Sequence, residues 1–418
     1  MQSPSSLRCV ACGEQPARSI EYRCPACGDV LEVDFEPTCG QWDALGPDDS
    51  LWRYGRRLGM GEAEPVTLGE GMTPLLEASP ALAGERFQGT LLLKDETRNP
   101  TGSFKDRLIS VAATRAIEEG YRAIVCASTG NAGASAAAYA ARAGIDCVIC
   151  VPQSTTRAKL AQIDAYGPTL LAVKGTYSAS WAVADALTRS GSFANVTTTY
   201  QNPHGVAALR TVAYELLDAM SGQVPDAVFV PTGSGPLVRG VQWGYAQALA
   251  LGLIESVPAV VAVQAAGCAP IVRAYDAQDE VVRPWEECET AAAGIADPLV
   301  GYAQDGTHTL ASVRASGGWA VAVSDDEIRS AAVDLGTGVG VLAEMAGAAG
   351  LAGLRASMRQ GRLSPDATAV VLVTGSGLKD LDLHQPGESR RVEIDPAGDD
   401  IDRIVERIAA SRLRREEG

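Results

Sequence analysis

The chain has 418 residues, 46% apolar and 21% charged, so it is long enough to bury a sizeable core in two or three domains. Its formal net charge of −16 argues against general nucleic-acid binding, which needs excess Lys and Arg to neutralise phosphates. No apolar run approaches the ~20 residues of a membrane-spanning helix, and the start, MQSPSSLRCVACG, lacks the basic end and apolar core of a signal peptide. We therefore expect a cytoplasmic protein with no nucleic-acid or membrane partner.

The N-terminal region contains two Cys-x-x-Cys-Gly pairs, Cys9 with Cys12 and Cys24 with Cys27. Each pair lets two thiolates reach one metal, and four thiolates at tetrahedral positions suit a structural zinc ion, which can fold a segment too short for its own core. Disulfides are the first alternative, but they are rare in a chain without a secretion signal. A redox site is the second, but it needs one pair rather than two. The pattern therefore predicts a zinc ribbon over residues 1–36.

After a stretch rich in Pro, Gly and acidic residues, short apolar runs alternate with alanine-rich helical segments. This rhythm predicts parallel sheets with right-handed crossovers. Ser103 is the expected N-cap of the first long helix, which we expect to end at Gly120, and Gly144 is expected to close the next helix. Cys147 and Cys150 lie three apart on an expected strand, so they face opposite sides and belong to the core. The expected strands are 91–96, 123–127, 146–152, 227–231 and 368–374, and the expected helices are 104–120, 132–144, 156–167 and 237–252.

Three glycine-containing loops follow three of these strands, where ligands bind in parallel α/β folds. The loop PTGSGPL places Gly233, Ser234 and Gly235 directly before a helix that begins at Pro236. Small residues let backbone N–H groups close around an anion there. The spacing matches neither a P-loop nor G-x-G-x-x-G, so a plain tight turn remains the alternative.

The other two loops offer polar side chains above the sheet. STGNAG contains Ser128, Thr129 and Asn131, for which ordinary N-capping is the alternative, and TGSGLKD begins with Thr374, which we expect to face a central cleft. In NPTGSFKDR, Lys105 follows a Gly-Ser turn at the start of a helix. On spacing alone, a solvated surface lysine would be the ordinary interpretation of this residue.

Taken together, these four motifs resemble the threonine synthase family, pyridoxal-phosphate enzymes of the tryptophan-synthase β-subunit fold, some of which carry an N-terminal zinc ribbon. The resemblance runs from about Leu51 to Leu381 and includes TLGEGMTPLL and GGWAVAVSDDEI. It implies an α/β fold of two open parallel-sheet domains, with the cofactor in the cleft between them (fold type II), preceded by the ribbon. The expected parts are a large domain at 37–110 and 202–384, a smaller one at 111–201, and a tail with a short helix at 385–418. A homodimer is also expected.

The resemblance further implies roles for individual residues. Lys105 would be the catalytic residue, forming a Schiff base with pyridoxal 5′-phosphate and moving protons, which a desolvated lysine with a lowered pKa does best. Asn131 would bond the ring hydroxyl of the cofactor, and Thr374 would face its pyridine nitrogen. The cofactor phosphate would be held by Gly233, Ser234, Gly235, Pro236 and Leu237, through every amide except that of Pro236, which has no N–H. Ser128 and Thr129 are the expected substrate-binding residues.

Threonine synthases eliminate phosphate from O-phosphohomoserine and add water at Cβ, so their substrate needs a second anion site. In the family, a stretch ending in Asn-Pro-His typically has Ser two residues before it and Arg directly after it. Tyr200 and Gly205 occupy these positions here. We therefore expect a weakened second phosphate site, which Tyr200→Ser with Gly205→Arg would restore. Candidate replacements for the missing charge are Arg210, Arg157 and Lys159.

The sequence thus predicts a pyridoxal-phosphate-dependent carbon–oxygen lyase for a small amino acid, either a threonine synthase or a relative with a modified substrate. One alternative is a β-replacement or dehydration enzyme acting on O-phosphoserine, serine or threonine. Another is a zinc-ribbon binding protein with a degenerate catalytic domain, against which the lysine and its companion motifs argue. His204 is expected to pack or cap rather than catalyse. Glu344 lies either near the cofactor ring or on a solvated helix face.

Overall fold

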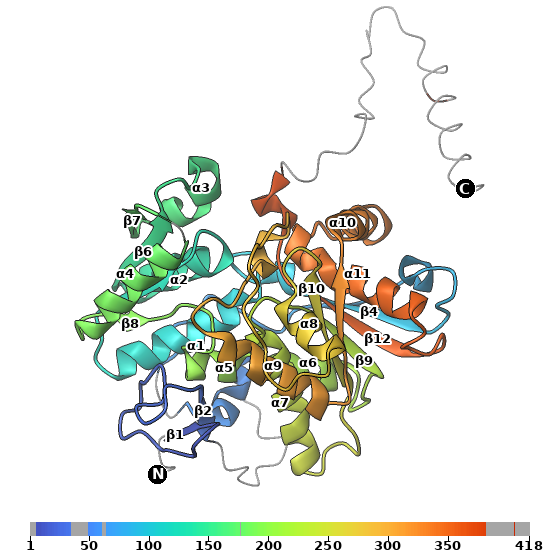
Figure 1. Ribbon diagram of the computed structural model, residues 1–418, viewed down its shortest axis with the longest axis horizontal. Helices are drawn as coiled ribbons and strands as arrows, with labels where there is room; N and C mark the ends of the chain where they lie inside the picture. The colour runs from blue at the N-terminus through green and yellow to red at the C-terminus, as the bar shows by residue number, and fades with distance from the viewer. Residues whose placement is uncertain (1–5, 35–48, 61–63, 176, 382–404, 406–418) are drawn as a thin grey trace, which may run out of the picture. The chain divides into compact units, whose positions relative to one another are not determined.

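The structure is a computed structural model that describes residues 6–34, 49–60, 64–175, 177–381 and 405. Within these residues the strands form a two-stranded, a four-stranded and a six-stranded sheet, and helices surround the two larger sheets (Figure 1). The described residues from 6 to 381 form one compact unit. Apart from residue 405, the expected C-terminal tail lies outside the described residues. No described helix is both long and apolar enough to cross a membrane.

The six-stranded sheet has the strand order β11-β10-β9-β12-β4-β3. Only its edge strand β3 runs antiparallel to its neighbour, whereas the other pairs are parallel. The carboxyl ends of β9, β12 and β4 therefore lie side by side at one edge of the sheet. The bounds are β3 Leu75–Ala78, β4 Thr90–Asp95, β9 Ala227–Pro231, β10 Ala259–Ala265, β11 Ala320–Val323 and β12 Thr368–Val373.

Both faces of this sheet are buried, as is usual for parallel strands. Along β9, Val228 and Val230 join one apolar cluster with residues of the helices α1, α6, α7, α8 and α9. Phe229, between them, joins a second cluster with α10 and α11. The bounds are α1 Lys105–Glu118, α5 Pro203–Ala208, α6 Thr211–Ala219, α7 Pro236–Ala250, α8 Pro270–Asp276, α9 Ala303–Ala315, α10 Asp325–Val339 and α11 Met345–Arg359, and the short 3-10 helices are η1 Leu51–Leu58, η2 Pro80–Ala83, η3 Glu96–Arg98, η4 Ala293–Ile295 and η5 Gly377–Lys379.

The four-stranded sheet has the order β7-β6-β5-β8 and is parallel throughout. Cys147 and Cys150 are both buried on β6 and join different apolar clusters, which confirms that they are core residues on opposite faces. The bounds are β5 Ala123–Ala127, β6 Asp146–Pro152, β7 Thr169–Val173, β8 Ala194–Asn195, α2 Asn131–Ala143, α3 Arg157–Ala165 and α4 Tyr177–Arg189. The expected domain boundaries stay a prediction.

Most expected elements are present within a residue or two of their predicted ends. The strand at 123–127 is β5, and Gly144 ends α2 in the left-handed conformation with φ +65°. The expected N-cap at Ser103 is wrong. Helix α1 begins at Lys105, so Phe104 stands at the cap position and no side chain caps the helix. Ser103 instead pairs through its backbone with Gly375, which takes it out of reach of a capping role.

The N-terminal segment forms an antiparallel pair, β1 Ser6–Cys9 with β2 Leu31–Asp34. Leu7, Leu31 and Val33 are buried in a small cluster that also takes in Ala207 of α5 and Trp243 of α7. The two strands are too short to form a core of their own, so this segment is built onto the helices of the large sheet.

Candidate active site

The ends of β4 and β12 join the segment NPTGSFK directly to the segment TGSG. The backbone N–H of Phe104 donates to the carbonyl oxygen of Thr374 over 3.1 Å, and that of Ser376 donates to the carbonyl oxygen of Gly102 over 2.8 Å. Because β9 is the other neighbour of β12, the glycine loop after β9 follows the adjacent strand. Motifs more than 100 residues apart in the sequence thus belong to one edge of one sheet.

Lys105 is the first residue of α1 and is partly buried. Its Nζ lies 4.6 Å from the centre of the Phe104 ring. Burial lowers the pKa of Lys105 to about 8, although the charges of Cys126, Asp297 and Glu344 oppose this shift. The lowered pKa increases the fraction of free amine near neutral pH compared with an ordinary lysine, as a nucleophilic lysine requires.

A buried ionic cluster fixes the start of α1. The guanidinium of Arg107 makes two bonds of 2.7 Å to the carboxylate of Glu96 and also bonds Glu215, which in turn binds Lys94 over 2.7 Å. Glu215 also accepts the backbone N–H of Met72, in the expected motif TLGEGMTPLL, over 2.9 Å. All four charged residues of this cluster are buried, and paired buried charges resist displacement because an unpaired one is costly. The cluster therefore holds the lysine-bearing helix against two other segments.

Asn131, at the start of α2, lies between two charged side chains. Its Nδ2 donates to Oε1 of Glu344 over 2.7 Å, and its Oδ1 accepts from Nζ of Lys379 over 2.7 Å. Burial raises the pKa of Glu344 and lowers the pKa of Lys379. Gly375 must lack a side chain here, because a Cβ would collide with the carboxylate of Glu344. The chain Lys379–Asn131–Glu344 fixes which way the amide points and leaves one N–H of Nδ2 for a further acceptor.

The loop after β9 turns sharply at Gly235, which has φ +102° and leads into α7 at Pro236. A Cβ on Gly235 would collide with Thr309 of α9. The Oγ1 of Thr309 also donates to the carbonyl oxygen of Ser234 over 2.6 Å. A loop of this shape at a helix N-terminus, locked from behind by another helix, suits an anion such as a phosphate.

The residues present fit the expected cofactor. Ser103, two residues before the lysine, is fully buried, and its Oγ has no hydrogen-bond partner among the described residues. A buried hydroxyl without a partner is costly unless a ligand satisfies it. Thr374 is buried at the end of β12, and Ser128 and Thr129 are partly buried at the end of β5.

Asp297 is a site residue that the sequence did not reveal. It lies against the glycine loop, since a Cβ on Gly233 would be 3.3 Å from its Cβ. Its Oδ1 accepts from the backbone N–H of Leu299 over 3.0 Å and from the hydroxyl of Tyr302 over 2.8 Å. Burial raises the pKa of Asp297, against the charge of Lys105 among other effects. The sequence feature that could have indicated Asp297 is its position as an acidic residue within the apolar run AAAGIADPLVG.

The expectation that an arginine at position 205 would restore a second phosphate site is wrong. Gly205 lies on α5, where a Cβ would stand 2.6 Å from Cγ of the fully buried Leu108, so no arginine fits. Tyr200 is also buried, and its hydroxyl bonds Oγ1 of Thr309 over 2.9 Å and the carbonyl oxygen of Gly235 over 3.3 Å. Both positions therefore support the core and the back of the glycine loop, and neither provides a cation for a second anion site.

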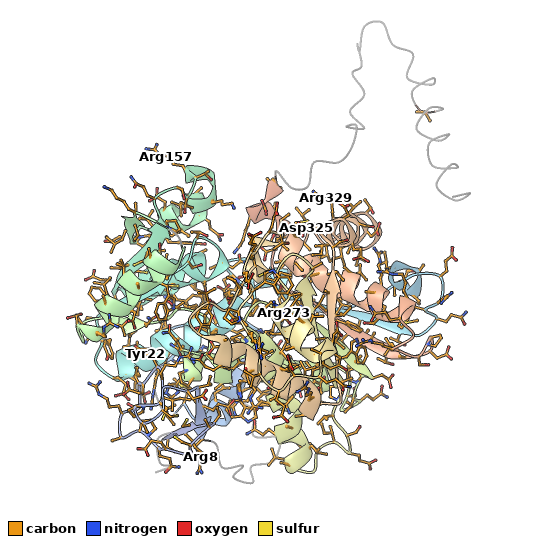
Figure 2. All side chains as sticks on the ribbon, viewed as in Figure 1. Arg8, Tyr22, Arg157, Arg273, Asp325 and Arg329 are labelled. Atoms are coloured by element: carbon orange, nitrogen blue, oxygen red, sulfur yellow. The ribbon has the colours of Figure 1, made fainter. Side chains whose placement is uncertain are left out.

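The three candidate replacements for the missing charge are one buried arginine and two exposed cations. Arg210 is buried, with its guanidinium 4.3 Å from the centre of the Trp243 ring. Arg157 and Lys159 are exposed at the start of α3, where Arg157 points outward at the edge of the molecule (Figure 2). His204 is buried, and its Nε2 lies 2.7 Å from the carbonyl oxygen of Ser19, in agreement with a packing role.

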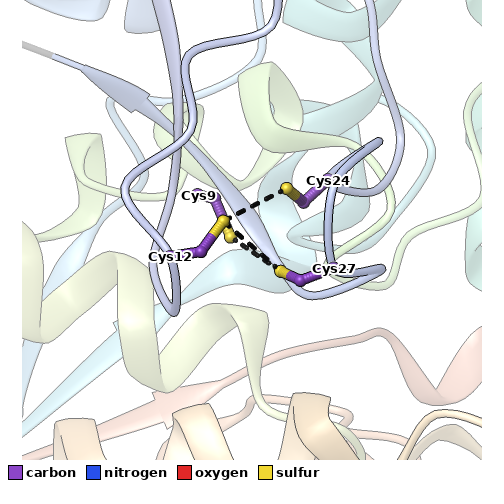
Figure 3. A group of neighbouring side chains, drawn as sticks. All are labelled: Cys9, Cys12, Cys24 and Cys27. Carbon is purple, nitrogen blue, oxygen red and sulfur yellow. Dashed lines mark hydrogen bonds between the residues drawn. The ribbon is translucent and has the colours of Figure 1, made fainter.

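The four N-terminal cysteines converge on one point (Figure 3). Their Sγ atoms all lie within 4.8 Å of one another, with 3.5 Å between Cys9 and Cys27, 3.6 Å between Cys12 and Cys24, and 3.5 Å between Cys12 and Cys27. Four thiolates bound to zinc at about 2.3 Å are about 3.8 Å apart. The residues present thus fit a tetrathiolate metal ion.

Comparison with known proteins shows the family of the chain. A family model described as "Pyridoxal-phosphate dependent enzyme" matches residues 66–375. The threonine synthase of Methanosarcina acetivorans is 34% identical over 90% of this chain and 92% of its own, and that of Mycobacterium tuberculosis is 37% identical over 85% and 94%. The solved structure of the processed form of threonine deaminase isoform 2 from Solanum lycopersicum matches with a TM-score of 0.67 at 21% identity, over 87% of this chain and 98% of that one. That last similarity concerns the fold alone.

Proposed function

Since the chain belongs to the threonine synthase family of pyridoxal-phosphate-dependent enzymes, we propose that it releases phosphate from O-phosphohomoserine and adds water to give threonine. The curated relatives that carry this name support the proposal. The observation that carries it is the position of Lys105, a partly buried amine with its pKa lowered to about 8 at the first residue of α1. A solvated lysine on the surface would not have a pKa lowered by burial.

In this proposal Lys105 holds the cofactor and moves protons at the α-carbon of the amino acid. When bound, pyridoxal phosphate supplies the electron sink that makes this carbon acidic. Gly233, Ser234 and Gly235, with the amide of Leu237, hold the cofactor phosphate at the N-terminus of α7, whose dipole favours the negative charge. The orphaned hydroxyl of Ser103, which pairs through its backbone with Gly375, is available to a ligand oxygen.

Asn131 presents its remaining N–H to the ring hydroxyl of the cofactor, with its orientation set by Glu344 and Lys379. Thr374 would offer the pyridine nitrogen a hydroxyl instead of a carboxylate. This would leave the nitrogen largely unprotonated, which moderates the electron sink and favours elimination and replacement over transamination. Ser128 and Thr129, at the end of β5, bind the amino-acid end of the substrate.

One structural zinc ion, bound by Cys9, Cys12, Cys24 and Cys27, completes the proposal. A closed four-thiolate site leaves no open position for chemistry, so the ion stabilises the ribbon. The expected cytoplasmic location and homodimer stay predictions.

The alternative substrate class is O-phosphoserine, serine or threonine, on which replacement or dehydration takes place at Cβ. The purified protein, loaded with pyridoxal phosphate, separates the two when phosphate release and the amino-acid product are measured with O-phosphohomoserine and with O-phosphoserine. Threonine from the first substrate supports the proposal, and turnover of the second alone contradicts it. Lys105→Ala serves as the inactive control.

A further inference from the structure

The ribbon is joined to the body of the protein through Glu32, in the middle of β2. Its carboxylate forms a two-point contact with the guanidinium of Arg239, with Oε1 2.6 Å from Nε and Oε2 2.7 Å from Nη2. Its Oε1 also lies 2.8 Å from Nε2 of His308. The side chains of all three residues are 15–17% exposed. Bidentate, charge-assisted contacts of this kind are geometrically specific as well as strong.

The two partners of Glu32 belong to the two helices that contact the glycine loop. Arg239 belongs to the first turn of α7, and its backbone N–H donates to the carbonyl oxygen of Gly235 over 3.1 Å. His308 directly precedes Thr309, which holds the carbonyl oxygen of Ser234. One ribbon carboxylate therefore bridges α7, which begins directly after this loop, and α9, whose Thr309 bonds the loop.

Further ribbon contacts reach the same helices. Val30, next to β2, packs in an apolar cluster with Tyr200, whose hydroxyl bonds Gly235 and Thr309 and whose ring lies edge-on to His308 with 5.2 Å between the centres. On α9, Asp305 lies 2.7 Å from the guanidinium of Arg23 in the ribbon.

We propose that Glu32 is a positioning residue for the cofactor: through Arg239 and His308 it keeps the loop 233–235 in the shape that grips the cofactor phosphate. The inference rests on the proposed function in one respect, that this loop is the phosphate site. It makes the ribbon part of the cofactor site rather than an independent appendage. Pyridoxal phosphate is then held less tightly whenever the ribbon is loosened.

The charge of Glu32 is maintained over a wide pH range. Burial by itself raises the pKa of Glu32, but the bonds from His308 and Arg239 outweigh it and lower the pKa to about 2. The carboxylate of Glu32 is therefore ionised at any pH near neutrality, so a substitution at this position is the way to remove its charge.

Asp34 provides a matched control, because it lies two residues away on β2. It pairs only within the ribbon among the contacts described, with Arg8 over 2.7 Å and with Gln15 over 3.0 Å. Asp34→Asn thus removes a ribbon carboxylate without touching α7 or α9. Glu32→Ala removes the clamp, and Glu32→Gln keeps its size but removes its charge.

The test is a spectrophotometric titration of each cofactor-free protein with pyridoxal phosphate, together with its thermal unfolding and its zinc content. We expect Glu32→Ala to weaken cofactor binding about tenfold, the effect of losing a charged two-point contact, and Glu32→Gln to weaken it less. We expect Asp34→Asn to leave binding within about twofold of wild type by the same measure. The 31P resonance of the bound cofactor is expected to shift in the Glu32 variants alone.

Equal cofactor affinity in wild type and both folded Glu32 variants overturns the inference, as does equal weakening by Asp34→Asn. If Glu32→Ala does not fold, the cofactor affinity of Glu32→Gln and the 31P shift of its bound cofactor decide whether the inference holds. A wild-type protein that binds no pyridoxal phosphate contradicts the proposed function instead, so the two failures are distinguishable.

Discussion

The backbone N–H of Phe104 donates a hydrogen bond to the carbonyl oxygen of Thr374 over 3.1 Å. This bond joins the residue before the proposed nucleophile to the residue proposed to face the cofactor ring. Because it is made by the backbone, the spacing between the two ends of the site does not depend on the side chains at either position. Substitution of Thr374 should therefore change the chemistry of the site while leaving Lys105 in place.

The pKa of Lys105 makes cofactor loading depend on pH. Only the free amine attacks the aldehyde of pyridoxal phosphate, and burial lowers the pKa of this lysine from an ordinary 10.5 to about 8. The rate of loading into cofactor-free protein is expected to rise with pH and level off above about 8. Stopped-flow absorbance at a fixed cofactor concentration measures it. A rate still rising with a midpoint near 10 would mean that the amine is solvated.

Glu344 is expected to act through Asn131. Glu344→Ala leaves the amide of Asn131 held by Lys379 alone, and loss of the buried hydrogen bond to Glu344, worth about 1.5–3 kcal/mol, predicts a kcat reduced by about 10- to 100-fold. Glu344→Gln keeps an acceptor and is expected to retain more activity. Steady-state kinetics and the absorbance of the bound cofactor provide the readouts. An unchanged kcat in Glu344→Ala, with the spectrum of the wild type, would exclude this role.

Gly205 and Gly336 form a matched pair of helical glycines. A Cβ at Gly205 meets Leu108 at 2.6 Å, whereas nothing lies within 4 Å of a Cβ at Gly336 on α10. Gly205→Ala is expected to destabilise the protein by about 1–3 kcal/mol through overpacking. Gly336→Ala is expected to stabilise it by up to about 1 kcal/mol.

Denaturant unfolding measures both substitutions. The same crowding predicts that Gly205→Arg, with or without Tyr200→Ser, impairs folding instead of improving turnover of O-phosphohomoserine. A stable Gly205→Arg protein with higher turnover would show that this position faces the substrate after all.

The ribbon is expected to hold about one zinc ion per chain. Cys24→Ser removes one ligand and is expected to lower the melting temperature and the cofactor content, but not the turnover of each cofactor-loaded chain. Cys288→Ser is the control, because Cys288 is exposed and lies outside the group of four. Elemental analysis with zinc supplied during expression checks the metal content. Protein free of metal and as stable as a zinc-loaded sample would contradict the assignment.

Local patterns were sufficient to predict much of the fold from the sequence. The apolar run at 123–127 is a strand with the expected bounds, and Gly144 ends its helix because glycine adopts φ +65° without strain. The cap of α1 was mispredicted at Ser103, whose preference for capping was overridden by pairing with Gly375, far away in the sequence.

The site was predictable only where its residues fall in compact motifs. Lys105 and Asn131 stand in such motifs, and the structure brings their segments together. Asp297 and the partnership of Glu32 with Arg239 were not predictable, because a carboxylate signals its partner only when both lie within a few residues. Gly205 was misinterpreted for a related reason: the sequence does not show that Leu108 occupies the space an arginine would need.

The central claim is that Lys105 carries pyridoxal phosphate in an enzyme that makes threonine from O-phosphohomoserine. The most direct measurement follows inorganic phosphate and threonine together, with wild-type protein and with Lys105→Ala. The account predicts equal amounts of phosphate and threonine from the wild type, and turnover at least about 10³-fold lower in the variant. Phosphate and threonine formation by Lys105→Ala at the wild-type rate, or no threonine from the cofactor-loaded wild type, would contradict it.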